Sequence, residues 1–162
     1  VVMPSMEGSR PILVELQALV VPTHFGVPRR TAQGVDANRV SLLVAVMEKR
    51  LGMHLLNQDI FLNIAGGIKV EEPGIDLGVI ASIASSFKDQ MIDPELVIFG
   101  EVGLGGEVRG ISQSEMRVKE ASRLGFKRCL LPKQNQEKMK GIKSIELIGV
   151  RTVQEAIKVL FK

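Results

Sequence analysis

Residues 71–78 read EEPGIDLG and residues 99–110 read FGEVGLGGEVRG, and these two glycine-rich segments decide the fold. After the Pro-Gly step of the first segment, apolar residues recur at helical spacing and predict a helix over residues 76–87. A strand over residues 96–99 leads into the second segment, whose clustered glycines are typical of a hairpin turn. A further helix and two more strands follow, so strands alternate with helices and predict an α/β fold with crossover connections.

The first part of the chain continues this alternation. Residues 12–21 read ILVELQALVV, a nearly unbroken apolar run that predicts a strand covered on both faces. Residues 22–35 contain two prolines and two glycines and predict a long exposed loop. A second strand is predicted over residues 59–65.

Helix starts and ends are marked by capping residues. Asp36 is positioned to cap a helix that Gly52 ends. Capping-box spacing predicts two more helix starts, at Ser112 and at Thr152. No change of composition marks a domain boundary, so we expect a single domain over residues 1–162.

Charge is distributed unevenly along the chain. Residues 117–143 contain nine basic side chains and two carboxylates, a net of +7, whereas the whole chain carries +3. Such asymmetry indicates a polyanionic partner, although a solvated lysine-rich face is a common alternative cause. Because the chain has no Trp, no Tyr and only six Phe, we do not expect it to recognise nucleic acid by stacking on bases.

Several classes of protein are disfavoured by composition. No apolar run approaches the roughly 20 residues that a membrane span needs, so we expect no membrane partner. Cys129 is the only cysteine, which leaves no disulfide within the chain and favours a cytoplasmic location. His24 and His54 lack a second ligand at metal spacing, and no Walker A loop occurs, so we expect neither a metal site nor an ATP site in these residues.

The two glycine-rich segments resemble the catalytic segments of Lon-type peptidases. The family's Gly-Glu hairpin is represented here by Gly100, Glu101, Leu104, Gly106 and Val108. In that register the family's serine position holds Asp76 and its lysine position holds Arg117. A carboxylate is a poor acyl acceptor, and a guanidinium with a pKa above about 12 cannot act as a base at neutral pH. We therefore expect a degenerate dyad in which Asp76 and Arg117 form an ion pair, and no peptidase activity.

Four further segments resemble the C-terminal domain of the bacterial RadA (Sms) family, a relative of Lon. They are residues 6–11, 28–31, 34–39 and 48–50, and they fall in order along the chain. The resemblance implies a Lon protease-like, two-layer α/β sandwich that forms one domain of a longer protein. It also implies DNA repair by homologous recombination, with a hexameric ring and ATP-driven branch migration in the full-length family member. ATP, magnesium and zinc are implied for the ATPase and zinc modules of that member, so we expect no cofactor in this chain.

Basic side chains are the candidate DNA-binding residues, because guanidinium groups suit phosphate oxygens. The candidates are Arg29, Arg30, Arg39, Lys49, Arg50, Arg117, Lys119 and Arg123. Contact between subunits of a ring is the alternative role for Arg29, Arg30 and Arg39. We thus expect a non-catalytic domain that binds DNA and helps to assemble a ring. The alternatives are an inert oligomerisation scaffold and an atypical Lon-like peptidase.

Overall fold

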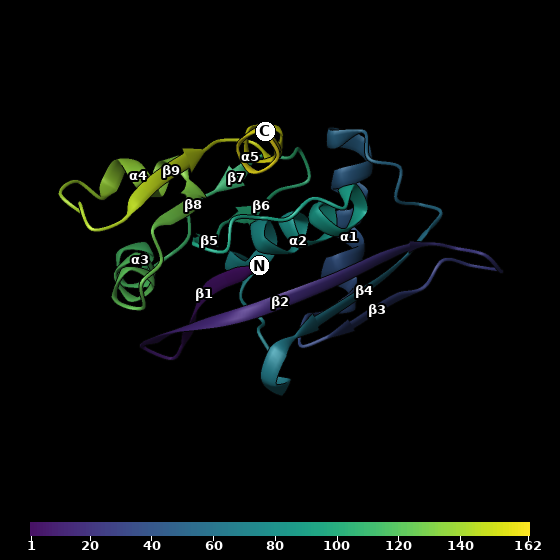
Figure 1. The fold of residues 1–162 in the computed structure, drawn as a ribbon, viewed down its shortest axis with the longest axis horizontal. Helices are drawn as coiled ribbons and strands as arrows, with labels where there is room; N and C mark the ends of the chain where they lie inside the picture. Colours follow the sequence, from purple (N-terminus) through teal and green to yellow (C-terminus); the bar gives the residue numbers. More distant parts are fainter.

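The computed structural model of the protein describes residues 1–162 and arranges them around a seven-stranded sheet of order β3-β4-β2-β1-β5-β8-β9 (Figure 1). Strand β2 pairs antiparallel with β1 and with β4, and the other four neighbouring pairs are parallel. The strands are β1 (Val2–Glu7), β2 (Arg10–Pro22), β3 (Arg30–Gln33), β4 (Gln58–Ile64), β5 (Leu96–Ile98), β8 (Arg128–Pro132) and β9 (Glu146–Val150). A separate small hairpin pairs β6 (Glu101–Val102) with β7 (Val108–Arg109), as the glycine-rich segment predicts.

The helices lie on both sides of the sheet. They are α1 (Ala37–Leu51), α2 (Asp76–Lys88), α3 (Ser114–Arg123), α4 (Lys133–Lys138) and α5 (Val153–Leu160), with single 3-10 turns at η1 (Ala65–Gly67) and η2 (Pro73–Ile75). The larger hydrophobic cluster packs α1, α2 and α5 against one face, and a smaller cluster packs α3 against the other. Figure 1 shows α3, α4 and β9 at one end of the long axis and β3 toward the other. None of the helices is long and apolar enough to cross a membrane.

The α/β architecture is confirmed, but the two halves of the sheet differ in how they are covered. In β5 and β8 successive side chains alternate between the two clusters: Ile98 and Leu130 face α2, whereas Val97 and Cys129 face α3. This half has three layers, where we expected two. The half built from β4, β3 and residues 16–22 of β2 keeps two layers, because the smaller cluster reaches β2 only at Leu13.

Strand β2 corrects the prediction of a strand covered on both faces. Glu15, Gln17 and Leu19 alternate with buried neighbours and are exposed, so the second face of β2 meets solvent over much of its length. The apolar run in the sequence therefore reflects β propensity as well as burial, and Leu19 remains 55% exposed.

The predicted long loop over residues 22–35 was partly wrong, because β3 forms inside it. Strand β3 pairs in parallel with β4 and lies at the edge of the sheet, where pairing to one neighbour suffices. Its four residues carry no strong local strand signal, so the pairing is a tertiary effect.

Three of the four predicted capping features are present. The Asp36 carboxylate accepts from the Asn38 amide, Gly52 takes a left-handed conformation after α1, and the Thr152 hydroxyl accepts from the Glu155 amide. The Ser112 capping box was wrong: α3 begins at Ser114, after a left-handed Gln113 that makes no side-chain cap.

Candidate functional site

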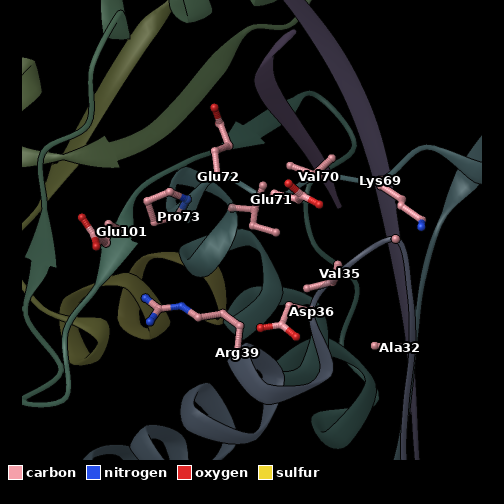
Figure 2. Close-up of a pocket in the computed structure, with 12 residues that line it drawn as sticks. Ala32, Val35, Asp36, Arg39, Lys69, Val70, Glu71, Glu72, Pro73 and Glu101 are labelled. Carbon is pink, nitrogen blue, oxygen red and sulfur yellow. The ribbon is translucent and has the colours of Figure 1, made fainter. Parts of the chain in front are cut away.

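A cleft of about 670 Å³ opens between the start of α1, the segment before α2 and the β6 strand (Figure 2). Its lining residues are Ala32, Gly34, Val35, Asp36, Arg39, Lys69, Val70, Glu71, Glu72, Pro73, Ile75 and Glu101. In Figure 2 the Arg39 guanidinium points toward the side of the cleft on which Glu101 lies. Ile75 in the lining precedes Asp76, so the cleft lies beside the predicted degenerate dyad.

Asp76 is fully buried at the first turn of α2 and is paired with Arg39 of α1. The Arg39 Nε atom donates to Asp76 Oδ1 at 2.9 Å, and its Nη2 donates to the other carboxylate oxygen. The Val102 amide donates to Asp76 Oδ2 at 3.0 Å, while Arg39 Nη2 also donates to the Val102 carbonyl at 3.1 Å. The hydrogen bond to Asp76 raises the pKa of Arg39. Asp76 thus ties α1, α2 and the β6–β7 hairpin together.

Arg117 also binds partners within the fold, but they are not those of Asp76. Its side chain is 3% exposed and forms a two-point ion pair with Glu72, in which Nη2 lies 3.1 Å from Oε2. Its Nε donates to the Ser112 carbonyl at 3.1 Å, and its Nη1 donates to the Pro4 carbonyl at 3.2 Å. These contacts join α3 to β1 and to the segment before α2.

The predicted ion pair between Asp76 and Arg117 is therefore wrong. Each side chain has a closer partner of opposite charge, Arg39 for Asp76 and Glu72 for Arg117, and no salt bridge joins the two. The positions are neighbours in the fold, since Arg117 passes within 3.4 Å of where a Cβ on Gly74 would stand. Two separate ion pairs replace the single pair that the register suggested.

The cleft offers no nucleophile of the kind used in peptidases. Its lining contains no serine, threonine or cysteine. The Ser85 hydroxyl lines a different cavity and donates to the Gln90 carbonyl. Cys129 is completely buried, and burial raises the pKa of its thiol, which keeps it protonated.

The prediction that Arg39 and Arg117 bind DNA is corrected by the burial of Arg117 and by the ion pairs of both side chains within the fold. Arg117 is buried among its acceptors and is not free to meet a phosphate, whereas the Arg39 guanidinium is 31% exposed but is held by Asp76. Arg30 is also committed, because its guanidinium donates to the carbonyls of Arg29, Gln58 and Leu55. Burial lowers the pKa of Arg30. Three of the eight candidates thus serve the fold.

The other five candidates are exposed and are spread over three separate segments of the chain. Arg29 directly precedes β3. Its Nε lies 3.7 Å from Asp59 Oδ2, and its guanidinium lies over the Phe61 ring. Lys49 and Arg50 are in the last turn of α1. Lys119 and Arg123 are on α3, where each pairs with a glutamate of the same helix. Helix α3 and strand β3 lie toward opposite ends of the long axis, so the candidates near them are well separated (Figure 1).

Four lysines that the residue-level prediction left out lie in the stretches of chain that lead into β8 and β9. This basic end consists of Lys127, Lys138, Lys140 and Lys143, which are exposed and make no salt bridge. A hydrogen bond of 2.8 Å between the Ser122 and Ser144 hydroxyls brings the end of α3 beside it. The excess of +7 over residues 117–143 was the sequence signal for this surface. No group of three or more His, Cys, Asp or Glu side chains is arranged to hold a metal ion.

Comparison with known proteins gives two findings. The chain is 57% identical over 158 residues to the DNA repair protein RadA of Halalkalibacterium halodurans, 58% over 154 residues to that of Bacillus subtilis and 50% over 157 residues to that of Listeria monocytogenes. These matches cover 98%, 95% and 97% of this chain, but the chain spans only about a third of the length of these curated relatives. The model of a family described as subunit ChlI of Mg-chelatase matches residues 25–135, which is more than half of the chain. The chain therefore belongs to the family described as subunit ChlI of Mg-chelatase.

Proposed function

We propose that this chain is a non-catalytic DNA-binding and ring-assembly domain of a RadA-type DNA repair protein. The observation that carries the proposal is the basic end, where four exposed lysines have no carboxylate partner. Unpaired ammonium groups on one surface attract the phosphate backbone whatever the base sequence. The similarity to RadA proteins from three organisms makes DNA the polyanion of choice.

The absence of peptidase activity is part of the same proposal. Both dyad positions are occupied by side chains that bind partners within the fold, and the adjoining cleft has no hydroxyl or thiol in its lining. We place the fold with the Lon-type peptidases. The start of α2 at Asp76, the β6–β7 hairpin and the buried Arg117 on α3 follow one another in the Lon-like order.

The longer protein is proposed to be the ATP-driven one. In that protein ATP and magnesium would belong to a separate motor module, zinc to a small cysteine module, and branch migration of recombination intermediates to the assembled hexamer. Membership of the ChlI family does not by itself assign a reaction to this chain, because one domain fold can serve several functions.

A gel shift at two salt concentrations, with light scattering on the same sample, tests the proposal. We expect retention of DNA that weakens steeply with salt, with a slope of roughly −0.9 per duplex phosphate neutralised in log affinity against log salt. Oligomers without DNA retention would instead identify an inert scaffold. Turnover of a casein or fluorogenic peptide substrate that an Asp76→Ala variant abolishes would identify an atypical peptidase.

A further inference from the structure

The loop between β2 and β3 has a stem that is fastened from both sides. The Asp59 carboxylate, on a residue only 6% exposed, accepts from the Thr23 hydroxyl at 2.9 Å and from the Arg29 amide at 2.8 Å. The Thr23 amide donates to the Asn57 carbonyl at 2.9 Å, and the Ile60 amide donates to the Arg29 carbonyl at 2.9 Å. Residues 24–28 are therefore presented as a short tip on a fixed base.

Arg30 reinforces this base from behind. Its guanidinium donates to three backbone carbonyls, those of Arg29, Gln58 and Leu55, and so joins the loop to the turn before β4 and to the start of that strand. A side chain used in this way lowers the number of conformations open to the loop, which reduces the entropy lost when the tip binds a ligand. The stem is organised to hold the tip in place.

The tip is apolar and fully open to solvent. Phe25 is 93% exposed and Val27 is 85% exposed, and the left-handed Gly26 between them has no atom within 4 Å of where its Cβ would stand. The other five Phe residues are buried or half-buried. One aromatic ring of six is therefore free, and it stands on a loop whose stem is held by side-chain and backbone hydrogen bonds.

Charge around the tip favours a nucleic acid over an apolar protein pocket. Residues 22–35 contain two arginines and no carboxylate. Arg29 is 73% exposed, and its contact with Asp59 at 3.7 Å is loose enough to leave guanidinium hydrogens for a phosphate. This loop carries an exposed ring and, four residues further on, an exposed guanidinium, the two groups that bind single strands when the ring stacks on a base and the cation contacts the backbone.

We propose that Phe25 stacks on an unpaired base of single-stranded DNA while Arg29 contacts a neighbouring phosphate. This inference rests on the proposed function, since it adds a stacking contact to the electrostatic contacts of the DNA-binding domain. It departs from the expectation that the chain recognises no base by stacking. That expectation rested on the number of aromatic residues, whereas the proposal rests on the position of one of them.

A tryptophan probe tests the stacking directly. The chain has no Trp, so Phe25→Trp places the only indole at the tip. We expect single-stranded oligonucleotide to quench its fluorescence and blunt-ended duplex of the same length to leave it nearly unchanged. Equal quenching by both, or quenching by neither, would overturn the inference.

Affinity measurements with a matched control complete the test. Phe25→Ala should weaken binding of single-stranded DNA about tenfold without changing the salt slope, because stacking releases no counterions. Leu104→Ala removes another exposed apolar side chain, 67% exposed at the hairpin tip, and should change nothing. Unchanged affinity in Phe25→Ala would contradict the stacking contact alone. Failure of the unaltered chain to bind any DNA would contradict the proposed function as well. Loss of self-association in Phe25→Ala, with DNA binding intact, would assign the tip to a second copy of the chain.

Discussion

The cleft beside α1 and the basic end at β8 and β9 both carry charge, but the charges differ in burial and in pairing. Around the cleft the charges of Asp76 and Arg117 are buried and paired, Asp76 with Arg39 and Arg117 with Glu72. At the basic end the lysines are exposed and unpaired. The open carboxylates of the cleft lining, Asp36, Glu71 and Glu101, would also repel a phosphate.

The buried charges beside the cleft hold segments of the chain together. One ion pair joins α1 to α2 and the other joins α3 to the segment before α2, so these four side chains contribute to the stability of the fold. Exposed charges that have no partner within the chain, such as those of the basic end, are the ones that our proposal assigns to binding.

The largest effect is expected at Asp76. Replacing it by Ala leaves Arg39 without its partner and the buried Val102 amide without an acceptor, which should lower the free energy of unfolding by about 3–5 kcal/mol. Urea denaturation checks this. Glu71→Ala is the matched control, because Glu71 is an exposed carboxylate of the same cleft that forms no salt bridge, and it should change stability by less than about 0.5 kcal/mol. Equal effects in the two variants would break the comparison.

A smaller loss is expected at Arg117. Arg117→Met keeps the aliphatic stem but removes the donors to Glu72, Ser112 and Pro4, which should cost about 2–3 kcal/mol. The loss is smaller than at Asp76 because Glu72 is 22% exposed and can regain water. A double-mutant cycle with Glu72→Gln measures the coupling, and a coupling energy near zero would contradict the structural role of this pair.

The basic end should respond in binding and not in stability. Changing Lys138, Lys140 and Lys143 together to Gln should reduce the salt slope of DNA binding by about two to three units and weaken affinity roughly tenfold at moderate salt. The free energy of unfolding should stay within about 0.5 kcal/mol, because these side chains are exposed and form no salt bridges. An unchanged slope would move the binding surface to Lys49 and Arg50, or to Lys119 and Arg123.

The contrast between the two regions also explains which predictions succeeded. Local signals were sufficient where the cause is local: Asp36, Gly52 and Thr152 cap their helices as predicted, and α2 begins at Asp76. The placement of Asp76 and Arg117 at one site stays a prediction, although Arg117 lies 3.4 Å from where a Cβ on Gly74, two residues before Asp76, would stand.

Predictions failed where the deciding partner is distant in the sequence. Arg39 lies 37 residues from Asp76, and Glu72 lies 45 residues from Arg117, so neither pairing follows from spacing along a helix or strand. Strand β3 depends on β4 in the same way. The DNA-binding candidates were chosen by residue type, and three of them proved to be internal ties, because a guanidinium suits a buried carboxylate or carbonyl as well as a phosphate.

The smallest effect on stability is expected at Asp59, a buried carboxylate whose cationic partner Arg29 is exposed. The amide of Arg29 and then the Thr23 hydroxyl hold the pKa of the Asp59 carboxyl below its usual value. A carboxyl with a lowered folded-state pKa stabilises the fold fully above its unfolded value of about 3.9, and this contribution is lost as pH falls through the folded value. The loop stem should therefore loosen only below about pH 4. Fluorescence anisotropy of the Phe25→Trp variant should then fall in that range, while the helical circular dichroism signal changes less. Asp59→Asn keeps an acceptor oxygen but cannot titrate, so the same fall in anisotropy in that background would show that the stem does not depend on this carboxylate.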